Sequence, residues 1–222
     1  MLAERMRSTR IAGVDRGRAS AFAAVAVAAC LLLTGCTAGG PAVDGDAART
    51  PSGASADVGD EALRDELLQM LADDQAERSG ESTAFNDLER TERLKEIVGE
   101  IGGWPTISLV GEDAEDAAWA IAQHSDHDLE FQREALALLR AAVEADDASP
   151  GNLAYLEDRV AVNAGEDQVY GTQVGCGDDG PAPATPIRDP ESVDERRAQA
   201  GLPPLADYLA EMSQICADVA TG

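Results

Sequence analysis

Apolar residues recur through the middle of the chain at intervals of three and four, the spacing that predicts amphipathic helices. The links between these stretches are short, which favours antiparallel packing of consecutive helices. The expected helices cover residues 60–78, 86–101, 112–124, 129–143 and 150–163. The pattern therefore predicts a helical domain that begins near the first of these stretches.

The pattern changes after the fifth expected helix. Residues 168–174 are the best candidate for a β-strand, and the Gly-, Asp- and Pro-rich run that follows predicts a loop with one partner strand. Ser192 and Glu195 have the spacing of a capping box, with the serine at the start of a short helix. A last apolar stripe follows Pro204. The expected fold class is mainly α (α+β), an antiparallel helical domain with a small β element near residues 168–190.

Composition narrows the range of partners. The chain has 222 residues and a formal net charge of −25, from 42 acidic and 17 basic side chains. So acidic a chain repels phosphate backbones, and no nucleic acid partner is expected. Hydrophobic residues make up 44% of the chain but aromatic residues only 4%, so we expect a thin core filled mainly by alanine and leucine.

The N-terminal segment has the three parts of a secretory signal. Residues 1–18 are rich in arginine, residues 19–33 are uncharged and mostly apolar, and small residues precede Cys36. The sequence Leu33-Thr34-Gly35-Cys36 resembles the lipobox of bacterial lipoprotein precursors. That resemblance implies that the Cys36 sulfur takes a diacylglyceryl group, with acyl chains such as palmitate, and that the chain is cut before this residue.

A protein processed in this way is held by lipid on the outer face of the bacterial cytoplasmic membrane, because a diacyl group supplies stable anchoring. The alternative is an uncleaved membrane-spanning anchor over residues 19–38, which the glycines at its end disfavour. The residues after the lipobox are rich in Gly, Ala, Ser, Pro and Asp and predict a flexible tether. The expected organisation is a signal peptide (1–35), a tether (36–58) and one mainly helical domain (59–220).

Two cysteines remain for pairing, since Cys30 leaves with the signal peptide and Cys36 takes lipid. Outside the cytoplasm, Cys176 and Cys216 are in a compartment that permits disulfides. A bridge between them would join the irregular region to the last helix and add about 4 kcal/mol by the loop-entropy relation. The alternative is two separate thiols, with Cys216 a small apolar residue on the helix stripe.

One short stretch, Gln123-His124-Ser125-Asp126-His127-Asp128, holds both histidines of the chain. Imidazoles beside carboxylates can supply a general base with an orienting group, or metal ligands. The histidines are three residues apart across a helix break, unlike a helical zinc pair, and no metal or cofactor is expected. In the structural alternative, Ser125 and Asp128 cap the following helix, and His124 ends the preceding one.

A second candidate is Tyr170-Gly171-Thr172-Gln173, where a strand would place two hydroxyl groups on one face. Glycine within a strand marks a bulge or a close approach by a ligand or another backbone, and with no ligand in view the bulge is favoured. The adjacent arginines Arg196 and Arg197 are expected to pair with local carboxylates.

These short motifs occur in an order that resembles a family of bacterial domains of uncharacterised function. The resemblance spans residues 86–210 and brings a shortlist of residues but no activity. Its motifs are Gly103-Trp104-Pro105, Ala118-Trp119, Gln123-His124-x-Asp126, Phe131-Gln132, Tyr155-Leu156-x-Asp158-Arg159-Val160, Tyr170-Gly171-Thr172-Gln173 and Val193-Asp194-x-Arg196-Arg197. The candidate polar site drawn from them comprises His124, Asp126, Gln132, Arg159, Tyr170, Gln173 and Arg197.

The sequence lacks G-x-S-x-G, S-x-x-K, a Walker loop and a dinucleotide fingerprint, so familiar hydrolase and nucleotide chemistries have no support.

The expected function is a lipid-anchored binding or interaction module, with an unknown envelope protein or small ligand as partner. The alternative is an envelope enzyme of the hydrolase type. In that enzyme, His124 is the base, Asp126 orients it, and Tyr170 or Gln173 polarises the substrate, so these side chains must converge in one cleft.

Overall fold

The structure is a computed structural model that describes residues 59–83, 86–177 and 180–221. The expected signal peptide, the expected lipid attachment at Cys36 and the expected tether all lie outside the described residues. Within the described ranges there are eight α-helices and one two-stranded antiparallel sheet, which confirms the mainly helical fold class. None of the helices in these ranges combines the length and the apolarity that a membrane span requires.

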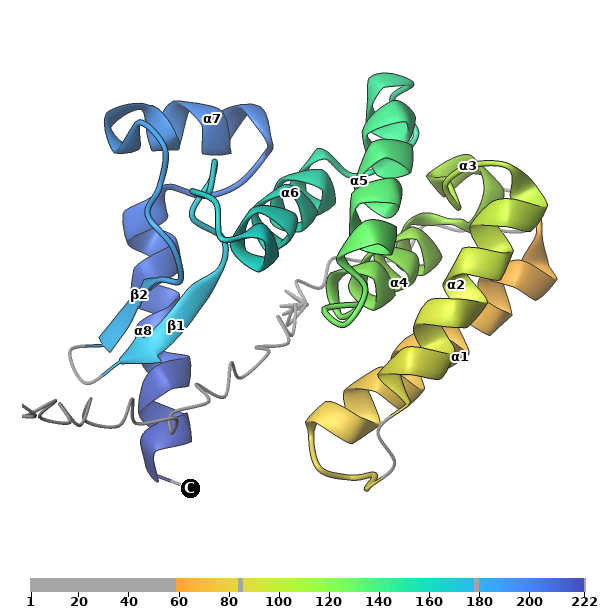
Figure 1. The fold of residues 1–222 in the computed structure, drawn as a ribbon, viewed down its shortest axis with the longest axis horizontal. Helices are drawn as coiled ribbons and strands as arrows, with labels where there is room; N and C mark the ends of the chain where they lie inside the picture. The colour runs from red at the N-terminus through yellow and green to blue at the C-terminus, as the bar shows by residue number, and fades with distance from the viewer. Residues whose placement is uncertain (1–58, 84–85, 178–179, 222) are drawn as a thin grey trace, which may run out of the picture.

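Six helices form the helical body, which we define as residues 59–164 (Figure 1). They are α1 (Glu61–Arg78), α2 (Asp87–Ile101), α3 (Ile107–Val110), α4 (Glu112–Gln123), α5 (Leu129–Glu144) and α6 (Pro150–Ala164). Helices α1 and α2 lie side by side at one end of the molecule. Helix α4 lies at the centre and contacts the other five helices of the body.

The ends of these helices follow local signals in the sequence. The Asp60 carboxylate accepts a hydrogen bond from the Leu63 amide at 3.0 Å and begins α1. Gly102 ends α2 in the left-handed region, at φ +70°, as the paired glycines there suggest. Ser149 begins α6 by accepting from the Asn152 amide at 3.2 Å. The five helices expected in this part of the chain are confirmed, and the short α3 is added to them.

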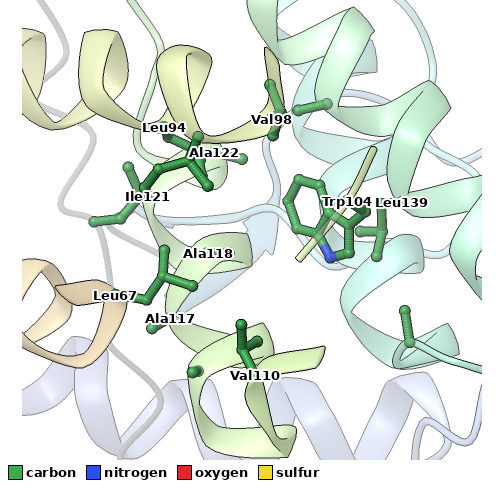
Figure 2. Close-up of a cluster of buried hydrophobic side chains, with 14 of the residues drawn as sticks. Leu67, Leu94, Val98, Trp104, Val110, Ala117, Ala118, Ile121, Ala122 and Leu139 are labelled. Carbon is green, nitrogen blue, oxygen red and sulfur yellow. The ribbon is translucent and has the colours of Figure 1, made fainter. Parts of the chain in front are cut away.

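The core is built around alanines of α4, several of which are fully buried (Figure 2). Small side chains on the central helix let its neighbours pack close to its backbone, and larger side chains from those neighbours complete the cluster. The main contributors are Leu67, Leu94, Val110, Ala114, Ala117, Ala118, Ile121, Ala122, Phe131 and Leu139. The expected alanine- and leucine-rich core is confirmed.

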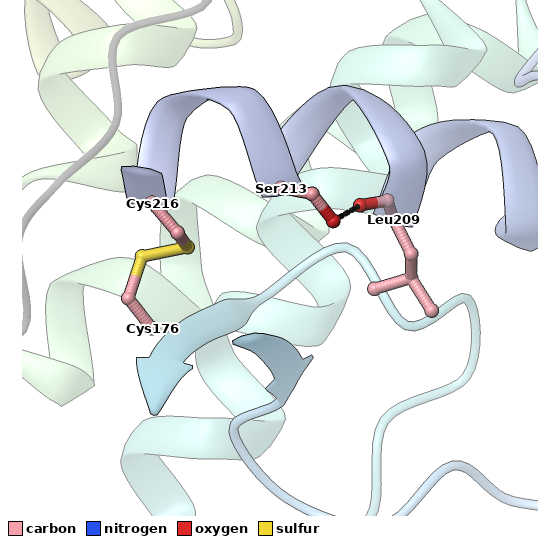
Figure 3. Close-up of a disulfide and its surroundings, with 4 residues drawn as sticks. All are labelled: Cys176, Leu209, Ser213 and Cys216. Atoms are coloured by element: carbon pink, nitrogen blue, oxygen red, sulfur yellow. Dashed lines mark hydrogen bonds between the residues drawn. A yellow bond between two sulfur atoms is a disulfide. The ribbon is translucent and has the colours of Figure 1, made fainter. Parts of the chain in front are cut away.

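The C-terminal segment, which we define as residues 168–221, holds the sheet. Its elements are β1 (Val174–Gly177), β2 (Gly180–Pro183), a 3-10 helix η1 (Pro190–Ser192), α7 (Val193–Gln199) and α8 (Leu205–Thr221). The strands pair in antiparallel fashion, and β2 contacts α8. A disulfide joins Cys176 of β1 to Cys216 of α8, the two cysteines that the sequence analysis pairs (Figure 3).

The strand expected over residues 168–174 is wrong for nearly its whole length, because β1 begins only at Val174. The backbone before it is turned by Gly171, which has φ +69°. A Cβ at this glycine would lie 2.5 Å from Ile187 Cδ1, so a close approach by a side chain explains the glycine, and the favoured bulge does not. The two hydroxyl groups therefore do not share a strand face.

Two of the expected helix caps are also wrong. Asp128 alone caps α5, accepting from the Phe131 amide at 3.0 Å, while the Ser125 hydroxyl donates to the Ile121 carbonyl at 2.8 Å inside the core. Ser192 precedes α7 without a side-chain capping bond and donates instead to the carbonyl of Asp189. In both cases the serine hydroxyl donates to a nearby backbone carbonyl and does not accept a bond from an amide of the following helix.

Candidate functional site

The residues of the expected polar site lie in three separate groups. The charged cluster consists of Asp74, Glu77, Arg78, Asp87, Arg90 and His124. The amide cluster consists of Gln123, Asp126, Gln132, Arg159, Asn163 and Gln173. The third group surrounds Asp158 and includes Tyr170 and Thr172, with Arg197 bonded to the backbone of Tyr170.

The charged cluster joins α1 to α2 through a buried ion pair. Arg90 donates to both oxygens of Glu77, from Nη1 to Oε1 at 2.9 Å and from Nη2 to Oε2 at 2.6 Å. Arg90 Nη2 also donates to Asp87 at 2.7 Å. The bond from Arg90 lowers the pKa of Glu77 below its ordinary value, and burial only partly offsets this shift. Two-point contacts of this kind fix both side chains in place.

His124, at the end of α4, completes the same cluster. Its Nδ1 lies 3.0 Å from Asp74 Oδ1, and Arg78 Nε lies 3.1 Å from both oxygens of that carboxylate. Burial by itself raises the pKa of the fully buried Asp74, but the bonds and charges of His124 and Arg78 outweigh burial and hold the pKa below its ordinary value. Arg78 Nε also lies 3.0 Å from His124 Nδ1, so His124 is held by both Asp74 and Arg78, and the orienting role expected for Asp126 is wrong.

A cavity of about 370 Å³ opens between α1 and α2. Glu77 and Arg90 line it, so the charged cluster forms part of its wall. Arg90 Nε is buried and has no hydrogen-bond partner in the described part of the chain. Met70 and Ala76 add apolar surface. The wall of the cavity thus includes a fixed ion pair beside apolar side chains.

The amide cluster connects the link between α4 and α5 to α6 and the C-terminal segment. Arg159 forms an ion pair with Asp126 and donates from Nη1 to Gln173 Oε1 at 3.1 Å. Asn163 Nδ2 lies 2.8 Å from both Asp126 Oδ1 and Gln132 Oε1. Four members of the expected site are therefore brought together here.

The contacts of Asp126 give this cluster a structural role. Its side chain is 46% exposed, but its carboxylate accepts hydrogen bonds from Arg159, Asn163 and Gln132. Burial raises the pKa of Asp126, whereas the charge and hydrogen bonds of Arg159 lower it, and the net pKa lies below its ordinary value. A carboxylate with a lowered pKa and several protein donors is a poor general base at neutral pH.

The side chain of Asp158, on α6, holds the C-terminal segment by binding backbone amides of that segment. This fully buried carboxylate accepts from the amides of Val169 at 2.6 Å, Tyr170 at 3.1 Å and Thr172 at 2.8 Å. The Thr172 hydroxyl donates to it as well, at 2.9 Å. Because one carboxylate takes these amides, they are not available to a strand ladder, which explains the absence of the expected strand.

The paired arginines of α7 bind backbone carbonyls. Arg197, fully buried, donates to the carbonyls of Tyr170 at 2.9 Å and Pro203 at 2.6 Å. Arg196 Nε donates to the carbonyl of Val169 at 2.8 Å. The expectation that both arginines pair with carboxylates is therefore wrong for the described residues, because the turned backbone offers them carbonyl acceptors that no strand uses.

A buried acid outside these groups is Glu115 of α4. Trp104 Nε1 donates to one of its oxygens and Asn152 Nδ2 to the other, each at 3.0 Å. Burial, reinforced by the neighbouring charge of Asp116, raises its pKa to about 7, and the two hydrogen bonds only partly oppose the shift. Since its side chain is fully buried, we assign Glu115 to the fold and not to a site.

The arrangement separates the side chains that the enzyme alternative requires. His124 is in the charged cluster, Asp126 and Gln173 are in the amide cluster, and Tyr170 is held at Asp158. Among the described residues, no hydrogen bond links His124 to any of the other three. Nor does this part of the chain contain a group of three or more His, Cys, Asp or Glu side chains placed to hold a metal ion.

Apart from His124, the members of the charged cluster were not among the predicted site residues, although the sequence holds a signal for them. Asp74 and Glu77 continue, at spacings of four and three, the buried stripe that includes Met70. Arg90 lies four residues before the buried Leu94 on α2. Charged residues at core-facing positions of two neighbouring helices indicate a buried ion pair between them.

The model of a family of unknown function, DUF6624, matches residues 55–217. This match is wider than the region of resemblance seen in the sequence and covers both the helical body and most of the C-terminal segment. The comparisons with curated proteins and with solved structures find no match.

Proposed function

This chain belongs to the DUF6624 family, which has no known function, and we propose from its own residues that it is a lipid-anchored binding module of the cell envelope. Its place is the outer face of the cytoplasmic membrane, and its binding site is the cavity between α1 and α2. Its partner is a small ligand that enters this cavity.

The anchor is supported by the sequence. An arginine-rich start, an apolar stretch and the Leu33-Thr34-Gly35-Cys36 motif are the features that lead to lipid attachment at the cysteine. The strongly negative charge of the chain argues against attraction to anionic headgroups, so a lipid at Cys36 has to supply membrane attachment.

The observation that carries the proposed site is the position of the charged cluster at the wall of a cavity. Burying Glu77 and Arg90 costs free energy even when they pair, so a purely apolar packing of α1 on α2 would serve stability equally well. Fixed charges beside an opening are instead what ligand recognition uses. A hydrolase has weaker support, because its expected base and its expected orienting group lie in different clusters.

A ligand screen tests the cavity. The full-length protein in detergent micelles is titrated with three small probes of similar size: butylammonium, butanamide and glutarate. We expect at least one probe to shift the amide NMR signals of residues that line the cavity. Ala76→Phe should fill the cavity and abolish the shift, whereas the matched Ala137→Phe on an exposed position of α5 should preserve it. No shift with any probe, or a shift that survives Ala76→Phe, would exclude this site.

A mass measurement tests the anchor separately. The intact protein extracted from membranes should lack residues 1–35 and carry a diacylglyceryl adduct at Cys36, and Cys36→Ser should remove the adduct and release the protein from the membrane. An unprocessed leader without an acyl adduct would contradict the proposed location.

A further inference from the structure

We propose that Glu115 is a proton-operated latch: while its carboxyl group is protonated, two links of the chain stay closed over the start of α4, and when it ionises they open. The links are residues 103–108, which precede α4, and residues 147–152, which lead from α5 into the first turn of α6. Together we call them the cover. None of these residues lines the cavity between α1 and α2, so the latch is independent of what that cavity binds.

The first observation is a fully buried acid without a cation. One oxygen of Glu115 accepts from the Trp104 indole and the other from the Asn152 side-chain amide, each at 3.0 Å. Within the described ranges, no basic side chain forms an ion pair with it. A buried carboxylate without a cation is costly, whereas a protonated carboxyl keeps both bonds because its hydroxyl oxygen also accepts. The geometry therefore favours the protonated acid while the cover is closed.

The charges around Glu115 do not supply the missing cation. Among the helices packed on this end of α4, Arg64 of α1 is paired with Asp113. Arg140 of α5 is paired with Glu157. The other charged side chains at this end of the helical body are acids, namely Glu100, Glu112, Asp116, Glu144, Asp146 and Asp147. Ionisation of Glu115 therefore adds a negative charge to an acidic region.

The change of charge falls near neutral pH. Burial, reinforced by the charge of Asp116, raises the pKa of Glu115 to about 7. The donors Trp104, Asn152 and the backbone amide of Ser149 only partly oppose this shift. When the cover is open, water reaches the carboxyl group and its pKa returns towards the ordinary value of 4.5. A rise in pH between these two values therefore favours the open form.

The two halves of the cover are joined to each other by Asp147. Its backbone carbonyl accepts from the Ile107 amide at 2.9 Å. Its carboxylate accepts from the amide of Ser108 at 2.8 Å and from the hydroxyl group of the same residue at 2.6 Å. Such links can open while the helices beside them persist, because local opening costs less than global unfolding. The bonds at Asp147 make the halves move together, and Glu115 binds both halves to α4.

Hydrogen exchange of the full-length protein in detergent micelles tests the latch. The reporters are the amides of Ile107, Ser108 and Asn152, whose hydrogen bonds lie within the cover. Their protection factors should be lower than those of buried α2 residues and should fall about tenfold between about pH 6 and about pH 8. Glu115→Gln, which has no charge at either pH, should abolish this fall, whereas the matched Glu134→Gln on an exposed position of α5 should preserve it.

The two tryptophans of the chain provide a readout that needs no variant. Trp104 Nε1 donates to Glu115, whereas Trp119 Nε1 has no hydrogen-bond partner in the described part of the chain. The NMR signal of the Trp104 indole proton should therefore shift with a midpoint at about pH 7, and the signal of Trp119 should not.

Four outcomes would overturn the latch. The first is a Trp104 indole signal that does not titrate. The second and third are cover amides whose protection is independent of pH, or falls equally in Glu115→Gln. The fourth is equal protection of the cover and of α2, which would show that Glu115 meets water only when the whole helical body unfolds.

Discussion

The helical body and the C-terminal segment are stabilised in different ways. In the body, helices pack side by side on the alanine-rich α4 and bury a continuous apolar cluster. The segment has little regular structure before α7 and is attached mainly through the Asp158 carboxylate and the amide cluster, with an edge contact between the rings of Tyr155 and Tyr208; Arg196 and Arg197 bind carbonyls within the segment itself. The body therefore draws its stability from many small contacts, whereas the attachment of the segment depends on a few individual side chains.

The largest expected effect comes from the side chain that attaches the segment. Asp158→Ala removes an acceptor from three backbone amides and one hydroxyl, at a cost of about 5 kcal/mol. Hydrogen exchange should show that residues 168–173 lose protection while α4 keeps its own. Equal loss of protection in both regions would mean that the two parts unfold as one unit.

The disulfide provides the next test, because both of its cysteines lie within the segment. Cys176→Ser/Cys216→Ser removes a cross-link with a sequence separation of 40 residues, worth about 4 kcal/mol by loop entropy. We expect α8 to exchange faster while the α1–α5 amides are unchanged. Faster exchange across the helical body would show that the disulfide also supports the contact between the two regions.

Glu115 is a titrating group of the helical body, so the pH dependence of unfolding can test the body by itself. The pKa of Glu115 is raised from 4.5 to about 7, so between these values the folded chain holds a proton that the unfolded chain has released. The free energy of unfolding should therefore fall as pH rises through this range, by up to about 3 kcal/mol. In urea denaturation, Glu115→Gln should lack this part of the pH dependence, and the exposed Glu134→Gln should retain it. Parallel pH profiles for both variants would contradict the assignment.

The smallest expected effects come from two residues at helix N-termini: Asp128, which forms a side-chain capping bond, and Ser192, which does not. Asp128→Ala removes the bond to the Phe131 amide together with the ion pair to Lys95, and should destabilise the body by about 1 kcal/mol. Ser192→Ala removes no capping bond of α7, so thermal unfolding should change by less than half as much. A loss of equal size in both variants would indicate that Ser192 caps its helix in solution.

The difference between the helical body and the C-terminal segment explains how far the sequence could predict the structure. Helices of the body were predictable because the spacing of apolar residues and the caps at Asp60 and Ser149 are local signals. Residues 168–173 were not, because their conformation depends on a carboxylate more than ten positions away, which takes amides that a strand would have used. Local composition carries no information on such a contact.

For the candidate site, the sequence identified residues but not their grouping. Asp126, Gln132, Arg159 and Gln173 were on one shortlist with His124, and the structure assembles the first four but turns His124 towards α1. Which carboxylate faces an imidazole depends on how α1 packs against the end of α4. Short motifs therefore locate polar residues, while the packing of distant helices decides which of them meet.

The alanines of α4 also limit which changes the fold can tolerate. With Ala114, Ala117, Ala118 and Ala122 fully buried, any larger side chain on these faces would push an entire neighbouring helix outward. Displacing α1 or α2 in this way would alter the width of the opening between them. Variation in the family is therefore expected to be concentrated on the outer helices, with the central one kept narrow.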